Sequence, residues 1–405
     1  MNKKVLVFVI ATTFIVLGTL AGISYLRGFK LDTQNKGLAR TGLLVIDSTP
    51  DGAQVFLDGR LTSATDTTIT FLTPKKYNLR LTKEGYNPWE KEVEVRADLT
   101  TEIESVLFPK TPDLRPLTYT GAVNPQISPD GSRLVYGVSI GEKSGLWVID
   151  MTDRPLGIGG SSRQIVKNTA QLDFTKAILL WSPESSQILA QLQLTGSKTE
   201  SSKRNFLLAV DKLNENLSDV TATLPATMTT WQQEINLKEN PRILRLRKDL
   251  PDIASASGAL LSKVLIEATQ SANFVPKLTP DNLNWSPNET KFFTLKSTDS
   301  KSPYSAGVTV WRVRDPNPLK TTPAKFEIPG AAHILWYPSS GHLILVEKDT
   351  ISIIEYEGTN RVSIFTGPFE NNFVFPWPNG TKLVILTNFN QSAETLPNLY
   401  TINLR

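Results

Sequence analysis

The chain of 405 residues contains no cysteine and only two histidines. Without cysteine it can form no disulfide, thiolate nucleophile, cysteine-linked lipid anchor or cysteine-ligated zinc site. His333 and His342 lie on either side of one turn, and no HExxH motif accompanies them, so no zinc site is predicted. No G-x-S-x-G nucleophile elbow and no glycine-rich nucleotide loop occurs. We therefore predict no catalytic residue, cofactor or metal.

Net charge is also small, at +4, and its distribution is uneven. Residues 1–40 hold six basic residues and one acidic residue, whereas residues 41–108 hold seven basic and eleven acidic residues. The excess positive charge thus accompanies the N-terminal apolar segment. This placement favours contact with a membrane surface over nucleic-acid binding, which needs a basic patch on a folded face.

The first long apolar run extends from Val5 to Leu26 without a charge or a proline. At a rise of 1.5 Å per residue it would span about 33 Å, enough for a hydrocarbon core of roughly 30 Å. We predict a transmembrane anchor over residues 1–26, followed by a polar stalk over residues 27–41. The four-residue tail before the span favours an N-terminus inside and the remaining chain outside. A cleaved signal peptide is the alternative, although its apolar region is normally shorter.

Short alternating strands are predicted after the stalk, over residues 42–108. Turn sequences such as Ser48–Gly52 and Asp58-Gly59 separate apolar stretches, and later stretches alternate apolar with polar residues. Six or seven strands in fewer than 70 residues predict a small antiparallel β-sandwich. Tyr86 and Trp89 in this segment suit either a small core or an exposed binding ledge.

This segment resembles the PEGA domain family, whose name describes a Pro-Glu-Gly-Ala motif. The resemblance implies an extracytoplasmic, often membrane-tethered module of prokaryotic surfaces without catalytic residues. Asp51 stands where the motif has glutamate, and Lys83-Glu84-Gly85-Tyr86 fits a later Gly-Tyr of the family. The residues that carry the motif are Pro50, Asp51, Gly52, Ala53, Asp58 and Gly59.

A different unit recurs five times after a linker over residues 109–117. Each copy places an apolar or aromatic residue before a proline turn, and a strand follows; the first reads SPDGSRLVY from residue 128. The repeated residues are Pro129, Asp130 and Gly131, Trp181 and Pro183, Trp285 and Pro287, Trp336 and Pro338, and Trp377 and Pro378.

Units of several strands that repeat every 40–54 residues predict the blades of a β-propeller over residues 118–405. A wider gap between Pro183 and Pro287 leaves room for a contracted unit at residues 258–268, which gives about six blades, with five or seven as alternatives. Residues 229–239 predict a helix inserted between blades and stopped by Pro241. Residues 114–119 could complete the last blade and close the ring.

The repeats are similar to the TolB-type and WD40-like propellers, whose blades carry the phrase W-S-P-D-G-x-x-I-x-Y. The resemblance covers residues 120–405 and implies a mainly β fold. Trp181, Trp285, Trp336 and Trp377 could stack against sugars or bases. Because each precedes its turn, packing between blades is the favoured interpretation.

Together these patterns predict a single-pass membrane protein with an extracytoplasmic β-sandwich and β-propeller. The expected role is a tethered scaffold that binds a protein or a cell-envelope polysaccharide through the propeller loops, with no nucleic-acid partner. Residues 196–203 and 297–306 are the candidate contact loops. The alternative is an envelope glycan hydrolase or lyase, because paired carboxylates converge in space and leave no fixed spacing in the sequence.

Overall fold

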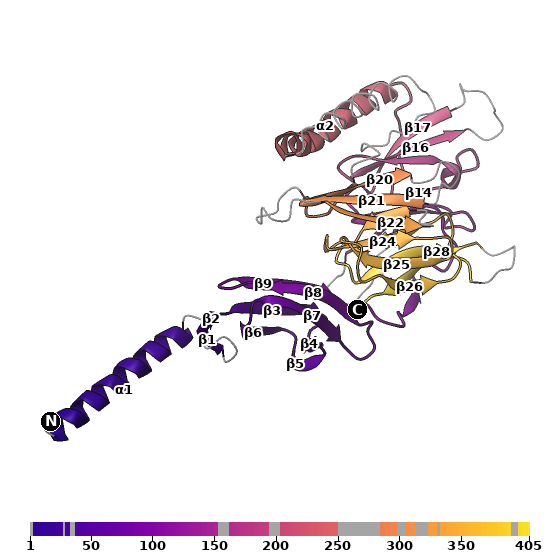
Figure 1. The fold of residues 1–405 in the computed structure, drawn as a ribbon. Coiled ribbons are helices and arrows are strands. Elements are labelled where there is room, and N and C mark those ends of the chain that lie inside the picture. Colours follow the sequence, from indigo (N-terminus) through magenta and orange to yellow (C-terminus); the bar gives the residue numbers. More distant parts are fainter. Residues whose placement is uncertain are drawn as a thin grey trace. The chain divides into compact units, whose positions relative to one another are not determined.

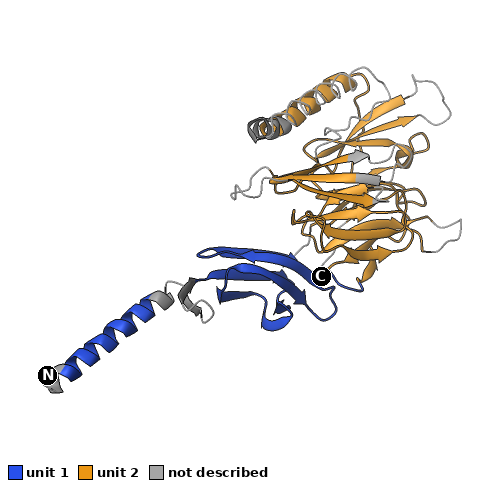
Figure 2. Ribbon diagram, viewed as in Figure 1, with its two compact units in different colours: residues 1–111 blue, residues 112–405 orange. Residues whose placement is uncertain are grey.

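The structure is a computed structural model, and its architecture is mainly β (Figure 1). It describes residues 3–26, 29–32, 37–152, 162–193, 203–249, 284–297, 305–312, 323–329, 333–389 and 396–405. These residues divide into two compact units, residues 1–111 and residues 112–405 (Figure 2). The boundary between them falls inside the linker expected from the sequence.

The N-terminal apolar run forms one helix, α1 (Lys3–Leu26). Its window Leu6–Ile23 is long and apolar enough to cross a membrane, and none of that window is buried in the structure. Exposed apolar area of this extent is costly in water and favourable in hydrocarbon. The helix therefore has the properties of a membrane span or of a signal sequence.

The segment predicted as a polar stalk after α1 contains two strands that the sequence pattern did not indicate. Strands β1 (Phe29–Asp32) and β2 (Gly37–Arg40) pair as an antiparallel hairpin. In β1, apolar and polar residues alternate over only four positions, which is too short a run to be recognised as a strand from sequence alone.

Seven strands form two sheets in residues 42–106. The three-stranded sheet has the order β6-β3-β9, and the four-stranded sheet has the order β5-β4-β7-β8. The strands are β3 (Gly42–Thr49), β4 (Gln54–Leu57), β5 (Arg60–Ala64), β6 (Thr67–Leu72), β7 (Lys75–Thr82), β8 (Trp89–Val95) and β9 (Thr100–Val106).

The sandwich is not wholly antiparallel, because β3 and β9 pair in parallel. A parallel pair needs a long connection, and here the five strands between β3 and β9 supply it. Local turn sequences predict neighbouring hairpins, so they could not reveal the pairing of the first and last strands. Leu44, Leu79 and Trp89 lie in the core between the sheets, so Trp89 is a core residue and not part of a binding ledge.

The second unit consists of four-stranded sheets whose strands follow one another in antiparallel order. Blade 1 contains β11–β14, blade 2 β15–β18, blade 3 β19–β22, blade 4 β23–β26 and blade 5 β27–β29 with β10. The strands are β10 (Leu114–Pro116), β11 (Val123–Ile127), β12 (Arg133–Val138), β13 (Gly145–Asp150), β14 (Ser162–Lys167), β15 (Ile178–Trp181), β16 (Gln187–Gln193), β17 (Lys203–Ala209), β18 (Ser218–Asp219), β19 (Asn284–Trp285), β20 (Lys291–Ser297), β21 (Ser305–Arg312), β22 (Ala324–Pro329), β23 (His333–Trp336), β24 (His342–Val346), β25 (Thr350–Glu355), β26 (Val362–Thr366), β27 (Val374–Pro376), β28 (Lys382–Thr387) and β29 (Asn398–Asn403).

Blade 5 is assembled from both ends of the propeller. Strand β10, which we had placed in the linker, pairs antiparallel with β29, and Leu114 faces Ile402 across the pair. Apolar side chains of blades 1 and 5, including Leu134 and Leu399, share one buried cluster. The closure considered for residues 114–119 is thus present, and it fixes the two ends of the unit to each other.

Five four-stranded sheets lie within the described residues of the second unit. The contracted unit expected at residues 258–268 falls outside the described residues, as do 196–202 and 298–304 within the candidate contact loops. The sixth blade and the contact loops therefore stay predictions.

The inserted helix is longer than expected: α2 extends over Leu224–Asp249 with Pro241 inside it. A proline within a helix costs roughly 3 kcal/mol, but arginine, leucine and lysine on its C-terminal side favour continuing the helix. Trp231 and Ile235, one turn apart, are buried. Lys238 donates to the Pro183 carbonyl oxygen at 2.8 Å and pairs with Glu184 at 3.0 Å, which attaches the helix to the blade 2 turn.

An ion-pair network joins blades 1 and 2. Arg163 contacts both carboxylate oxygens of Asp150, at 2.5 and 2.9 Å, and donates through Nε to the Val210 carbonyl at 2.7 Å. Arg133 lies 3.4 Å from Asp150 and donates to the Ser185 carbonyl at 2.6 Å. The hydrogen bond from Arg163 is the main cause of a lowered pKa of the Asp150 carboxyl group.

We expect Asp150→Asn to lower the free energy of unfolding by about 1–3 kcal/mol at pH 7, because a charge-assisted pair with two partly buried arginines is lost. A carboxyl group with a lowered folded pKa stabilises the fold above its unfolded pKa, about 3.9, and loses that effect as pH falls through the folded value. Urea unfolding followed by tryptophan fluorescence should show the difference at pH 7 and a smaller one at pH 3. An equal loss of unfolding free energy at both pH values would contradict the role of the Asp150 carboxylate as an ion-pair partner.

Candidate functional site

The repeated proline turns are built by side-chain hydrogen bonds. In blade 1, Asp130 accepts from the Ser128 hydroxyl at 2.6 Å and from the Ser132 backbone N–H at 3.0 Å. In blade 3, Asn288 accepts from the Ser286 hydroxyl at 2.9 Å and from the Thr290 N–H at 3.1 Å. Aspartate and asparagine favour such turns because their side chains satisfy nearby backbone donors.

The fourth residue of every turn has a positive φ, whatever its side chain. The angles are 71° at Gly131, 58° at Ser185, 56° at Glu289, 61° at Ser340 and 72° at Gly380. Glycine adopts this conformation without strain, whereas serine does not.

Serine has a second role at this position, because it connects neighbouring blades. The Asp130 N–H donates to the Ser185 hydroxyl at 3.2 Å, and the Asn288 N–H donates to the Ser340 hydroxyl at 3.1 Å. Both serines are fully buried. Blades 4 and 5 are linked differently, by the Tyr337 hydroxyl donating to the Gly380 carbonyl. Neither serine was predicted from the sequence, although serine recurs at this one turn position.

Three of the repeat tryptophans are buried, with exposures of 4% for Trp181, 8% for Trp336 and 2% for Trp377. Trp285 is half-buried and lies against Phe292 with ring centroids 5.3 Å apart. The positions of these tryptophans in their turns are not equivalent. The backbone N–H of Trp377 donates to the Lys382 carbonyl, whereas in blade 2 the corresponding bond runs from the Ser182 N–H to the Gln187 carbonyl. Trp377 thus stands one residue later in its turn. The three buried rings leave no face for a ligand.

The PEGA-type residues make turns in the first unit. Gly52 and Gly59 have φ angles of 71° and 78°, and Ala53 is buried. Asp58 accepts from Lys75 at 2.6 Å and from the Asn78 N–H at 2.9 Å, and the bond from Lys75 is the main cause of its lowered pKa. The motif also includes Asp51 and Pro50. The Asp51 carbonyl accepts a hydrogen bond from Lys83 at 2.7 Å, and Pro50 follows a cis peptide bond.

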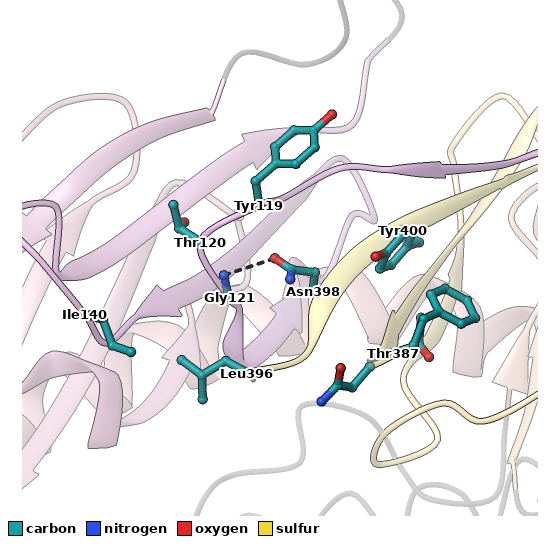
Figure 3. Close-up of a pocket in the computed structure, with 10 residues that line it drawn as sticks. Tyr119, Thr120, Gly121, Ile140, Thr387, Leu396, Asn398 and Tyr400 are labelled. Atoms are coloured by element: carbon teal, nitrogen blue, oxygen red, sulfur yellow. Dashed lines mark hydrogen bonds between the residues drawn. The ribbon is translucent and has the colours of Figure 1, made fainter. Parts of the chain in front are cut away.

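A pocket of the second unit lies at the junction of blades 1 and 5, where β10 closes the propeller (Figure 3). We call it the seam pocket; its volume is about 480 Å³. It is lined from both blades by Tyr119, Thr120, Gly121, Ile140, Thr387, Asn388, Phe389, Leu396, Asn398 and Tyr400.

The floor of the seam pocket is held by hydrogen bonds around one asparagine. The Asn398 Oδ1 atom accepts from the Gly121 N–H at 3.0 Å and from the Thr118 hydroxyl at 3.1 Å (Figure 3 shows the first). Thr118 is buried, and its hydroxyl also accepts from the Leu399 N–H at 2.9 Å. Because Oδ1 is held by two donors, the orientation of the Asn398 amide is fixed, which leaves its Nδ2 as a donor at the pocket.

Gly121 is required at this floor for two reasons. Its φ is +83°, and a Cβ there would lie 2.8 Å from the Leu396 Cβ. A side chain at this position would be both strained and in collision with the opposite wall.

The pocket combines aromatic rings with neutral polar groups. Phe389 and Tyr400 form an edge-to-face pair, with centroids 5.0 Å apart and an interplanar angle of 87°. Tyr119 is 80% exposed and Phe389 44% exposed. None of the ten described lining residues is aspartate, glutamate, histidine, lysine or arginine. These residues could not be identified from the sequence, because the pocket forms only when positions 119 and 398 meet.

The two histidines do not form a joint site. His342 is buried and lies against Tyr337, with centroids 5.9 Å apart, whereas His333 at the start of β23 is exposed. Within the part of the chain that the structure describes, no group of three or more histidine and acidic side chains could hold a metal ion.

Comparison with known proteins finds a family match in the first unit. Residues 41–111 match the model of the PEGA domain family. No curated protein matches the chain. Similar solved structures include a putative TolB from Agrobacterium tumefaciens, at 11% identity and a TM-score of 0.23, covering 76% of each chain. TolB from Acinetobacter baumannii is 10% identical, with a TM-score of 0.24, covering 82% of this chain and 60% of that one.

An oligogalacturonate lyase in complex with manganese is also similar, at 10% identity and a TM-score of 0.23, covering 93% of this chain and 96% of that one. At these values no residue role is transferred from any of these structures.

The fold defines a mainly β protein in which an apolar helix precedes a small sandwich and a propeller. The sandwich matches the PEGA domain family over residues 41–111, as its turn residues had indicated.

Proposed function

We propose that the protein is a membrane-tethered, extracytoplasmic binding protein of a prokaryotic cell envelope. Helix α1 anchors it with the N-terminus inside, and the propeller binds a protein or an envelope polymer. The observation that carries the proposal is the apolar surface of α1, since the whole window Leu6–Ile23 is unburied in a chain whose other two parts have their own cores. A PEGA domain next to the helix supports the outside placement.

Binding is favoured over catalysis by the chemistry of the seam pocket. Its described lining residues offer aromatic rings, amides and hydroxyls, but no carboxylate. A glycoside hydrolase normally needs a pair of carboxyl groups. Hydrogen bonds at the junction of blades 1 and 5 hold the pocket in shape before any partner arrives, which lowers the ordering cost of binding.

The orientation can be tested with single cysteines, because the natural chain has none. We expect Lys176→Cys, at a side chain that is 83% exposed, to react with a membrane-impermeant maleimide on intact cells. Asn2→Cys should react only after permeabilisation. Labelling of the residue 176 thiol only after lysis would contradict the outside placement.

The binding role can be tested with the same strategy in membrane vesicles. A benzophenone maleimide on Thr120→Cys, at the pocket, should cross-link an envelope component. The same reagent on Lys176→Cys is the matched control, since this residue lies outside the pocket. The proposal fails if the two positions give the same products or none.

A further inference from the structure

We propose that the seam pocket binds a neutral glycan, with the rings of Tyr119 and Phe389 as stacking surfaces. This inference rests on the proposed function, because it names the ligand class of the same site. Three features carry it: where the exposed aromatic rings lie, how they are held, and which charges the pocket lacks.

Exposed aromatic rings gather at this one place. Outside α1, the described residues expose large aromatic side chains only at Tyr119 and Phe389, and both line the seam pocket. Ile140, which is 68% exposed, lines the same pocket. Scattered exposed apolar residues need no explanation, but a gathered group at a concave site marks a binding surface.

The rings come from the two blades whose junction forms the pocket. Tyr119 precedes β11 of blade 1, and Tyr400 lies on β29 of blade 5, and the Gly121–Asn398 hydrogen bond joins their two segments (Figure 3). The edge-to-face contact of Tyr400 with Phe389 fixes the second ring. Ring faces carry negative charge and attract weakly positive C–H groups, which sugar rings display on their flat faces.

The polar groups of the pocket suit hydroxyl partners without charge. Thr120 offers an exposed hydroxyl, and the Asn398 Nδ2 atom can donate while its Oδ1 is held. A phosphate or a uronic acid would find no cation among the ten described lining residues, and binding such an ion would leave its charge uncompensated. The volume of about 480 Å³ lies in the range of small-ligand sites and fits one or two sugar units.

The test is binding of the full-length protein in detergent micelles to immobilised hexasaccharides. The probes are neutral manno-, malto- and N-acetylglucosamine oligomers, with oligogalacturonate as the acidic comparison. We expect saturable binding to at least one neutral probe and none to the acidic one. Tyr119→Ala should weaken binding about tenfold or more, as truncation of a central anchor does. Tyr119→Phe keeps the ring and should stay within about threefold.

Ile178→Ala is the matched control, because Ile178 is 50% exposed and lies in blade 2 away from the pocket. The inference is overturned if Tyr119→Ala leaves binding intact, if the protein prefers the acidic probe, or if it binds none of the probes. The vesicle cross-linking separates the two proposals. A peptide-containing adduct from Thr120→Cys would reject the glycan and leave the binding role standing, whereas no pocket-specific adduct would reject that role as well.

Discussion

Trp377→Ala will lower the free energy of unfolding of the propeller by about 3–5 kcal/mol, the usual cost of removing a fully buried large aromatic side chain. Trp377 is 2% exposed and lies in the cluster shared by blades 5 and 1, with Val384 and Leu399. The Lys382 Nζ atom lies 5.0 Å from the centre of its ring. Alanine would leave a cavity at the junction where the two ends of the propeller meet.

The measurement is urea unfolding of the full-length chain, followed by far-UV circular dichroism. Trp377→Phe should cost less than alanine, because phenylalanine fills most of the space and the indole N–H has no acceptor among the described residues. Trp285→Ala is the matched control: its ring is half-buried, so its loss should cost less than that of Trp377. Equal losses for the two alanine variants would show that burial between blades does not determine the role of the repeat tryptophans.

Much of the fold follows from local patterns in the sequence. The β7 strand, Lys75–Thr82, alternates buried with exposed residues, and it lies within the segment whose alternation predicted short strands. The first turn, from Ser128 to Gly131, is specified by its own side chains, so a single copy already predicts it. Such elements are predictable because the interactions that form them lie within a few residues.

Features that depend on distant partners were not predictable in this way. The parallel pairing of β3 with β9 joins positions about 57 residues apart, and no local signal encodes it. The one-residue displacement of Trp377 is visible only from its backbone hydrogen bond to Lys382. The seam pocket is the extreme case, since Gly121 and Asn398 are separated by 277 residues. A sequence pattern can indicate that a propeller closes, but it does not show which side chains the closure brings together.

Closure itself leads to the second prediction. We expect Thr118→Val to lower the free energy of unfolding by about 2–3 kcal/mol, because valine matches the shape of threonine but cannot accept the buried Leu399 N–H. It also removes one of the two donors to Asn398, so the floor of the seam pocket loses a support. The loss should therefore appear both in urea unfolding and in binding at the pocket.

Thr118→Ser is the control, because it keeps the hydroxyl and removes only a methyl group. Its cost should be about 1 kcal/mol or less, close to that of one buried methylene. If valine and serine cost the same, the hydroxyl does not hold β10 against β29. If valine destabilises the protein but leaves its binding unchanged, the hydrogen bond closes the propeller without shaping the pocket. A loss in both measurements would show that one buried hydroxyl joins the ends of the propeller and positions the Asn398 amide for a ligand.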